Sequence, residues 1–296
     1  MPTDFATAVG AAILGLVVGS FLNVVIHRLP RMLQAQWAAA LHEPATPGPT
    51  GQTESMQTNT ADNADLGPSL RPYNLAVPGS HCPQCGHGLR WFENIPVLSY
   101  LALKGRCSAC HAPIGWRYPA IELLSALLFV WSFQQHELSA TAFAWAGFAT
   151  ALLALAAIDA DTSLLPDAIT LPLLWAGLLA ASLGLSQVSL QMAVWGAALG
   201  YLFLWSVVVL FKVVTGKEGM GQGDFKLLAA LGAWLGWPSL LSLVLLASFS
   251  GIAGGLWLRL RQRLPEGGYI PFGPYLVLAG LWVMVFGPPL PLLQFF

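Results

Sequence analysis

Long apolar runs separated by short polar connections make up most of this 296-residue chain. The first run, residues 5–26, matches the ~20 residues that an α-helix needs to cross the hydrocarbon core of a bilayer. Further runs follow almost without a break after residue 118, and the run at 225–237 is short enough to be tilted or partly re-entrant. The pattern predicts an all-α polytopic membrane protein with about eight transmembrane helices, at residues 5–26, 120–133, 140–158, 168–183, 190–213, 225–237, 239–258 and 272–292.

One long polar stretch interrupts the apolar runs and defines the predicted domains. The first transmembrane helix occupies residues 1–27, a module follows at 28–117, and a seven-helix membrane domain occupies 118–296. Within the module, residues 33–78 are rich in Pro, Gly, Thr and Asn and show little hydrophobic periodicity, which predicts a flexible segment. Residues 79–116 hold all four cysteines together with short apolar segments, and we expect them to fold as a small unit.

Composition and charge agree with a membrane protein and predict its orientation. Charged residues make up 9% of the chain, against roughly 25% in soluble proteins, and the net charge of -1 argues against a nucleic-acid partner. All 13 Lys and Arg residues fall on one side of an eight-span arrangement. Because basic residues stay on the cytoplasmic side, the module is predicted to be cytoplasmic and both termini to lie outside. The residues before the first run carry no Lys or Arg, so we expect a retained helix and not a cleaved signal peptide.

The four cysteines form two CxxC pairs, Cys82 with Cys85 and Cys107 with Cys110, separated by 21 residues. This spacing is typical of a structural zinc site, in which two tight turns point four thiolates at one tetrahedral ion. Zinc binding would also fold a unit too small to hold a good core alone. The alternatives are a redox-active pair and four simply reduced thiols. Histidines beside the pairs make a mixed ligand set conceivable: His81, His87 and His111.

A few acidic residues lie at the predicted cytoplasmic ends of the spans. Asp159, Asp161 and Asp167 lie between the third and fourth spans, and Asp224 begins the sixth. Charge is costly to bury near lipid, so each is a functional candidate. Two carboxylates in a partly dry site cannot both ionise easily, so that one keeps a proton while the other acts as a base. Such a pair can activate a water molecule to attack a peptide carbonyl.

Each of these acids also has a structural interpretation. Asp167 follows Pro166 at a helix start, where an N-cap role explains it, and Asp224 is a second candidate N-cap. Asp161, two residues after Asp159, faces the other way on a helix and is expected to be solvated. The glycines beside Asp224 favour function there, because they allow a substrate backbone to approach and the helix start to unwind. A further acid, near the start of the second span, is a candidate to pair with Arg117: Glu122.

With these residues in place, the whole chain resembles the type IV prepilin peptidases, a family of bifunctional leader peptidases and N-methyltransferases. The resemblance rests on the two CxxC pairs, the acids between residues 158 and 167, and five further motifs. A GxGD motif alone would be weak, since presenilin-like proteases share it, but the combination is specific. The five motifs are GSFLNVVIHRLP at 19–30, ENIP at 93–96, RYPAIE at 117–122, GQGDFK at 221–226 and PFGP at 271–274.

The resemblance implies a role for particular residues. It makes Asp159 and Asp224 the catalytic aspartates of a GxGD-type membrane aspartic protease. It implies structural Zn²⁺ on the four cysteines and S-adenosylmethionine as methyl donor. Supporting positions in the peptidase motifs are Gly221, Gly223 and Asp167, and the region implied in methylation includes Glu93, Gly105 and Arg106.

The resemblance also implies substrates and a location. The expected substrates are type IV prepilins and type II secretion pseudopilins, whose short basic leader is cut after Gly at the cytoplasmic face. The new N-terminal residue is then methylated, and the enzyme lies in the bilayer of the bacterial inner membrane with periplasmic termini. The alternatives are a proton-coupled transporter with a cytoplasmic zinc docking module, and a structural scaffold. The chain shows none of the internal repeats common in transporters, and its acids lie at one membrane face.

Overall fold

The computed structural model of the chain describes residues 4–42, 73–217, 220–261 and 270–289. Its described part is helical and contains no β-strand, as the apolar pattern predicts. Two short 3₁₀ segments, η1 (Trp91–Asn94) and η2 (Trp237–Ser239), and the five-residue helix α2 (Leu98–Ala102) accompany eight longer helices. These are α1 (Phe5–His42), α3 (Arg117–His136), α4 (Ala140–Thr162), α5 (Asp167–Ser182), α6 (Leu190–Thr215), α7 (Gln222–Leu235), α8 (Leu240–Leu260) and α9 (Gly273–Phe286).

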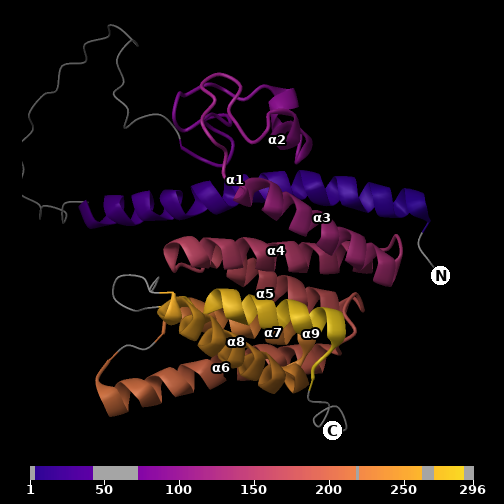
Figure 1. Cartoon of the computed structure of the whole chain (residues 1–296). Helices are drawn as coiled ribbons and strands as arrows, with labels where there is room; N and C mark the ends of the chain where they lie inside the picture. Colours follow the sequence, from indigo (N-terminus) through magenta and orange to yellow (C-terminus); the bar gives the residue numbers. More distant parts are fainter. Residues whose placement is uncertain (1–3, 43–72, 218–219, 262–269, 290–296) are drawn as a thin grey trace, which may run out of the picture.

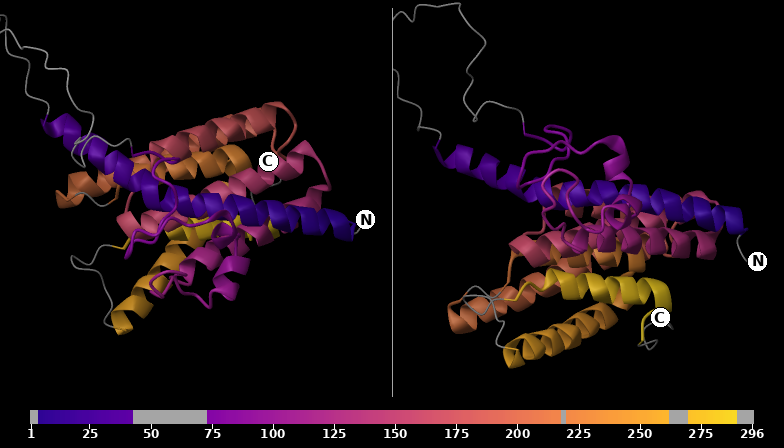
Figure 2. Two further views of the ribbon diagram at one scale, coloured as in Figure 1. Left: turned by 90° about the horizontal axis from the view of Figure 1, so that it is seen from above. Right: turned by 45° about the horizontal axis from the view of Figure 1, so that its top comes forward.

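The eight longer helices run alongside one another as a bundle (Figure 1), and η1 and α2 belong to a small module packed over α1 and α3. Among the described helices, those covering residues 5–41, 140–162, 190–215 and 237–260 are long and apolar enough to cross a membrane by themselves. The shorter α5 and α9 are also apolar. In the two further views (Figure 2) the module lies against one side of the bundle.

One of the two shortest helices around the core, α7, is the most buried. In α7, 10 of the 14 residues are buried, and this helix packs against α5, α6 and α9. The indole of Trp234 stacks on Phe148 of α4 with ring centroids 4.7 Å apart, and its Nε1 donates a hydrogen bond to the Leu173 carbonyl of α5. The run expected to be short is therefore a central helix surrounded by protein.

The first helix is longer than its apolar run. It continues from Phe5 through Pro30 to His42, so residues 28–42, which the sequence placed in the module, are helical. The segment after Pro30 is rich in Leu, Gln and Ala, which favour helix even where they are polar on average. Residues 33–42 of the predicted flexible segment are therefore helical, and its part at 43–72 lies outside the described residues.

Glycine pairs bring two sets of helices into close contact. On α6, Gly196 and Gly200 lie one turn apart and face α7, where a Cβ at either position would overlap backbone atoms. On α1, Gly15 and Gly19 meet the backbone of α3 in the same way. Small residues four apart are a common device for close helix packing in membranes. These contacts set the positions of the helices that carry the acidic residues.

We expect Gly232→Ala to destabilise the protein, because the added Cβ would overlap the Gly196 carbonyl oxygen across the contact between α6 and α7. Overpacking of this kind costs about 1–3 kcal/mol. The unfolding temperature in detergent measures the effect. Gly147→Ala on α4 is the matched control, since nothing lies within 4 Å of its added Cβ. Equal unfolding temperatures for the two variants would contradict the predicted role of the contact.

Candidate active site

Two buried aspartates occupy helix ends that the fold brings together. Asp159 lies in the last turn of α4 and Asp224 is the third residue of α7. Each is only 5% exposed, and their carboxylates lie close enough for the charges to interact. N-terminal backbone N–H groups of a helix favour a negative charge, which helps α7 to hold Asp224. The N-cap of α7 is Gly221, so the predicted capping role of Asp224 is not seen.

Each aspartate keeps one buried oxygen without a partner among the described residues, although the backbone N–H of Gly273 bonds to the Asp159 carboxylate. Oδ2 of Asp159 and Oδ1 of Asp224 are buried and have no hydrogen-bond partner within the described part of the chain. The start of α9 closes one side of the site, because a Cβ at Gly273 would overlap Oδ2 of Asp159. A buried carboxylate oxygen without a partner is costly, so two of them on neighbouring acids point to a functional site. The PFGP motif contains Gly273, but the sequence alone gave it no role at the acids.

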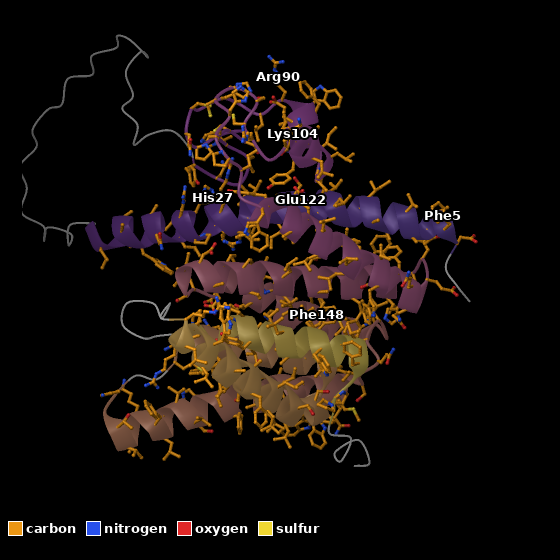
Figure 3. The ribbon with its side chains drawn as sticks, in the orientation of Figure 1. Phe5, His27, Arg90, Lys104, Glu122 and Phe148 are labelled. Atoms are coloured by element: carbon orange, nitrogen blue, oxygen red, sulfur yellow. The ribbon has the colours of Figure 1, made fainter. Side chains whose placement is uncertain are left out.

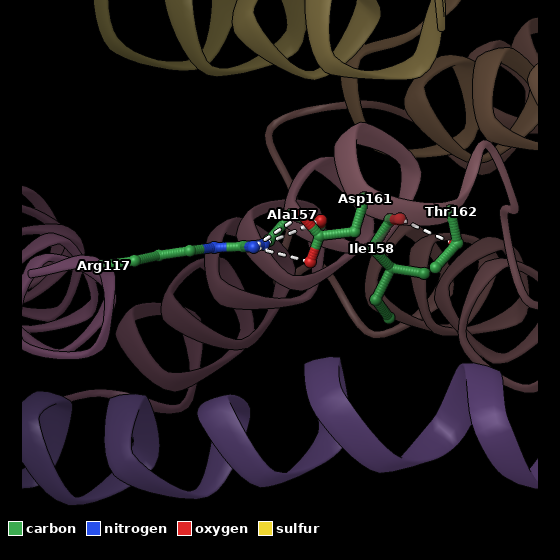
Figure 4. A network of polar contacts seen from close by, with 5 residues as sticks. All are labelled: Arg117, Ala157, Ile158, Asp161 and Thr162. Carbon is green, nitrogen blue, oxygen red and sulfur yellow. Dashed lines mark hydrogen bonds and ion pairs between the residues drawn. The ribbon is translucent and has the colours of Figure 1, made fainter. Parts of the chain in front are cut away.

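An ion pair on the polar rim fixes the end of α4 next to Asp159 (Figure 4). Nη1 of Arg117 binds both carboxylate oxygens of Asp161, at 2.6 and 2.5 Å. Its Nη2 also donates to the Ala157 carbonyl at 2.9 Å. The expectation that Glu122 pairs with Arg117 was wrong, because Glu122 accepts the backbone N–H of Val97 instead. Asp161 faces away from Asp159 as predicted, yet it is paired and not merely solvated.

A second ion pair joins the helices on the other side of the acids. Nζ of Lys226, two residues after Asp224, lies 2.7 Å from each carboxylate oxygen of Asp167. The N-cap role predicted for Asp167 was wrong, since Pro166 is the N-cap of α5 and no side chain caps that helix. The carboxylate of Asp167 binds a cation instead of the backbone. This contact ties α5 to α7 beside the buried pair.

The two glycines near Asp224 have different surroundings. A Cβ at Gly221 would meet nothing within 4 Å, so this side of the helix start is open. At Gly223 an added Cβ would come 2.7 Å from Cβ of Leu165. Gly221 therefore leaves room beside the acid, as the sequence suggested, while Gly223 allows close packing. In the structure α7 is already helical from Gln222, so its start is not unwound.

The four cysteines converge at the module's two tight turns. Their Sγ atoms all lie within 4.8 Å of one another, with Cys82 and Cys110 at 3.8 Å and Cys85 and Cys107 at 4.0 Å. All four are free thiols, and the separations fit the ~3.8 Å edge of a tetrahedron with ~2.3 Å metal–sulfur bonds. Histidines do not join the cluster. The cysteines therefore form a group that can hold a metal ion.

At two of the four cysteines the backbone favours thiolate, the form that binds metals. Hydrogen bonds from the N–H groups of Cys85 and Gln84 lower the pKa of the Cys82 thiol to about 7. The N–H groups of Cys110 and Ala109 lower the pKa of Cys107 in the same way. Each half of the module thus supplies an acidified thiol. This arrangement fits a soft divalent cation such as zinc.

The residues implied in methylation divide into structural and exposed positions. The Glu93 side chain is 6% exposed, accepts the Arg90 N–H at 2.8 Å and lies 3.4 Å from His87. Hydrogen bonds lower the pKa of Glu93. The largest effect comes from the Ser108 hydroxyl and a smaller one from the Arg90 N–H. Gly105 has φ +68° and lies against the Tyr100 ring. Only Arg106 is exposed and has no side-chain partner among the residues that the structure describes.

Comparisons with known proteins agree with this geometry. The family model for the bacterial peptidase A24 N-terminal domain matches residues 13–136, and that for the type IV leader peptidase family matches residues 146–256. No solved structure matches the chain.

Relatives described as prepilin leader peptidase/N-methyltransferase align over nearly the full length. One from Burkholderia pseudomallei (strain K96243) is 50% identical over 293 residues, which cover 99% of this chain and 89% of the relative. A second from Pseudomonas aeruginosa is 49% identical, covering 93% and 89%, and a third from Aeromonas hydrophila is 48% identical, covering 92% and 88%. The chain therefore belongs to the type IV leader peptidase family.

Proposed function

We propose that this protein is a membrane aspartic endopeptidase that removes the leader of type IV prepilins and pseudopilins and then N-methylates the new N-terminus. The buried pair formed by Asp159 and Asp224 carries the proposal, because one oxygen of each acid has no partner among the described residues. Full-length similarity to prepilin leader peptidase/N-methyltransferases supports it. The same comparisons give no support to the transporter alternative, and a pure scaffold would leave the buried pair unexplained.

In the proposed cleavage the two carboxylates share the work of acid and base. The ionised carboxylate takes a proton from a water molecule, and the water oxygen attacks the carbonyl carbon of the scissile bond. The protonated carboxyl donates a hydrogen bond to the carbonyl oxygen as it gains negative charge. The C–N bond then breaks as the leaving nitrogen takes up a proton. The two carboxyl groups hold different protonation states, because two buried carboxyl groups this close cannot both ionise easily.

The rim contacts suit this chemistry because they fix the carboxylates without consuming them. Arg117 and Lys226 lie on the rim, and each is paired with another acid, Asp161 or Asp167. Neither cation neutralises the catalytic pair. Gly273 packs its backbone against Asp159, while the open space beside Gly221 leaves room for the scissile bond.

The module is assigned to methylation and to metal binding. The amine released by cleavage is a nucleophile, and bound S-adenosylmethionine would supply the methyl group that it attacks. The exposed guanidinium of Arg106 is suited to a carboxylate of that donor. The four cysteines would hold zinc in a closed, structural site.

The proposed setting follows from the charge distribution. The basic residues gather on the side of the aspartates and the module, so we assign that side to the cytoplasm and both termini to the periplasm of the inner membrane. A basic leader then stays on the cytoplasmic side while the apolar helix that follows it enters the bilayer. The scissile bond lies between the two, at the level of the aspartates.

We expect Asp159→Asn and Asp224→Asn each to abolish prepilin cleavage, because an amide can neither act as the base nor share the proton. Gel mobility of a purified prepilin incubated with the enzyme in detergent measures cleavage. Glu137→Gln is the control, since this exposed carboxylate lies between α3 and α4 at the other end of the bundle. Cleavage at the wild-type rate by both Asn variants would refute the assignment.

Gly273→Ala is expected to lower cleavage on the order of 100-fold, since its Cβ would displace the Asp159 carboxylate by an amount comparable to a ~1 Å misplacement. Single-turnover cleavage rates measure the loss. Gly10→Ala serves as the control, because an added Cβ there meets nothing within 4 Å. An unchanged rate in Gly273→Ala would show that the start of α9 does not position the acid.

Cys107→Ser is expected to lose bound zinc and to impair methylation at least as much as cleavage, because the metal holds the module together. Atomic absorption gives the zinc content, and transfer of labelled methyl groups to pre-cleaved pilin isolates the second activity. Gln84→Ala, an exposed change between Cys82 and Cys85, keeps all four thiols and should behave as wild type. Full methylation after complete metal loss would contradict the structural role of the site.

A further inference from the structure

The part of the module next to α3 exposes large apolar side chains. In α2, Leu98 is 64% exposed and Leu101 is 66% exposed, and Trp116, just before α3, is 76% exposed. Scattered exposed apolar residues are ordinary, but a contiguous group marks an interaction surface. On α3 itself, three further leucines are exposed and are expected to face lipid: Leu123, Leu124 and Leu127.

A hydrogen bond fixes how deep α2 lies along the bundle. The backbone N–H of Val97, the residue before α2, donates to Oε2 of Glu122 at 2.8 Å. Arg117, the first residue of α3, marks the polar rim, because it pairs with Asp161. Glu122 is five residues further along α3, or ~7 Å deeper at ~1.5 Å per residue. The start of α2 therefore lies below the rim, beside the lipid-facing surface of α3.

The cysteine end of the module lies nearer the rim. His81, next to Cys82, is close enough to His27 for their charges to interact, and His27 follows the apolar run of α1. Figure 3 shows Lys104 and Arg90 on the module, away from α1 but opposite the stretch of α1 between His27 and Phe5. The module thus leans along the bundle, with its cysteines toward the rim and α2 toward the membrane interior.

From this placement we propose that α2 inserts into the leaflet on the module's side, with Leu98 and Leu101 in contact with lipid acyl chains beside α3. Burial of these side chains in lipid removes their apolar surface from water. Lys104 follows α2 closely and is exposed, so its long side chain can extend toward the anionic headgroups of that leaflet. Trp116 takes the interfacial position that tryptophan favours in membrane proteins.

Lipid contact also accounts for the backbone at the start of α2. Val97 has φ +57°, a conformation that is strained for a β-branched residue. The turn directs Leu98 and Leu101 outward, where no described side chain covers them, while the bond to Glu122 holds the turn in place. If the two leucines faced water, nothing would compensate for the strained turn. In a leaflet, the removal of their apolar surface from water would compensate for it.

The test uses the full-length protein in nanodiscs of phosphatidylcholine and phosphatidylglycerol, with no other protein present. The photoreactive residue p-benzoylphenylalanine replaces Leu98 or Leu101, one at a time. Gln84, exposed in the cysteine turn near the rim, is the control position. After irradiation, mass spectrometry measures lipid adducts per protein. We expect several-fold more adduct at positions 98 and 101 than at 84.

Only variants that keep the wild-type unfolding temperature are compared, and either leucine position alone decides the outcome if the other variant unfolds. Lipid adducts no more frequent at 98 and 101 than at 84 would overturn the proposal. Cross-links from 98 or 101 to a second copy of the chain would also overturn it, and would assign the surface to self-association. Neither result depends on cleavage or methylation, so the proposal stands or falls separately from the enzymatic assignment.

Discussion

The cost of burying charge near lipid governs this structure, because the helices carry several acids at the level where the membrane begins. Three of these acids are satisfied in ordinary ways: Asp161 by Arg117, Asp167 by Lys226, and Glu122 by a backbone N–H. The remaining two, Asp159 and Asp224, are buried and keep oxygens without partners. Burying two interacting carboxylates in this way is energetically costly, so we expect the fold to retain them for function. Their isolation is therefore the strongest sign of function in the fold.

Close helix contacts keep the two acids in place. Asp224 begins α7, whose backbone meets α6 through Gly196 and Gly232, so the helix is held by main-chain packing and not by adaptable side chains. Asp159 ends α4, where Arg117 binds the preceding carbonyl of Ala157. The start of α9 then covers Asp159 through a glycine. Rigid elements around the two acids suit the proposed catalytic role, which needs their geometry held within a fraction of an ångström.

Sequence reasoning reached the elements that have a strong periodic or spacing signal. Apolar runs gave the helices, and two CxxC pairs gave the cluster of Cys82, Cys85, Cys107 and Cys110. The predicted partners of Glu122 and Asp167 were wrong. Their actual partners are distant in the sequence, 59 positions away for Asp167, and no local sequence pattern indicates such a contact. The contact of Gly273 with Asp159 was equally hidden, since only the fold brings α9 to the end of α4. The extension of α1 to His42 was missed because polarity was taken to end the helix, whereas helix propensity continued it.

The first two turns of α3 connect the module to the aspartate pair. Arg117 reaches the end of α4 within two residues of Asp159, and Glu122 holds the start of α2. Both contacts come from one rigid helix, so a change in the tilt of the module shifts the rim of the active site as well. An enzyme that cuts a membrane substrate and then modifies the new end needs the two parts that do this at the same membrane depth. The proposed parts are the aspartate pair and the module. A single helix bonded to both parts holds them at that depth, and lipid contact at α2 would fix the same depth from outside.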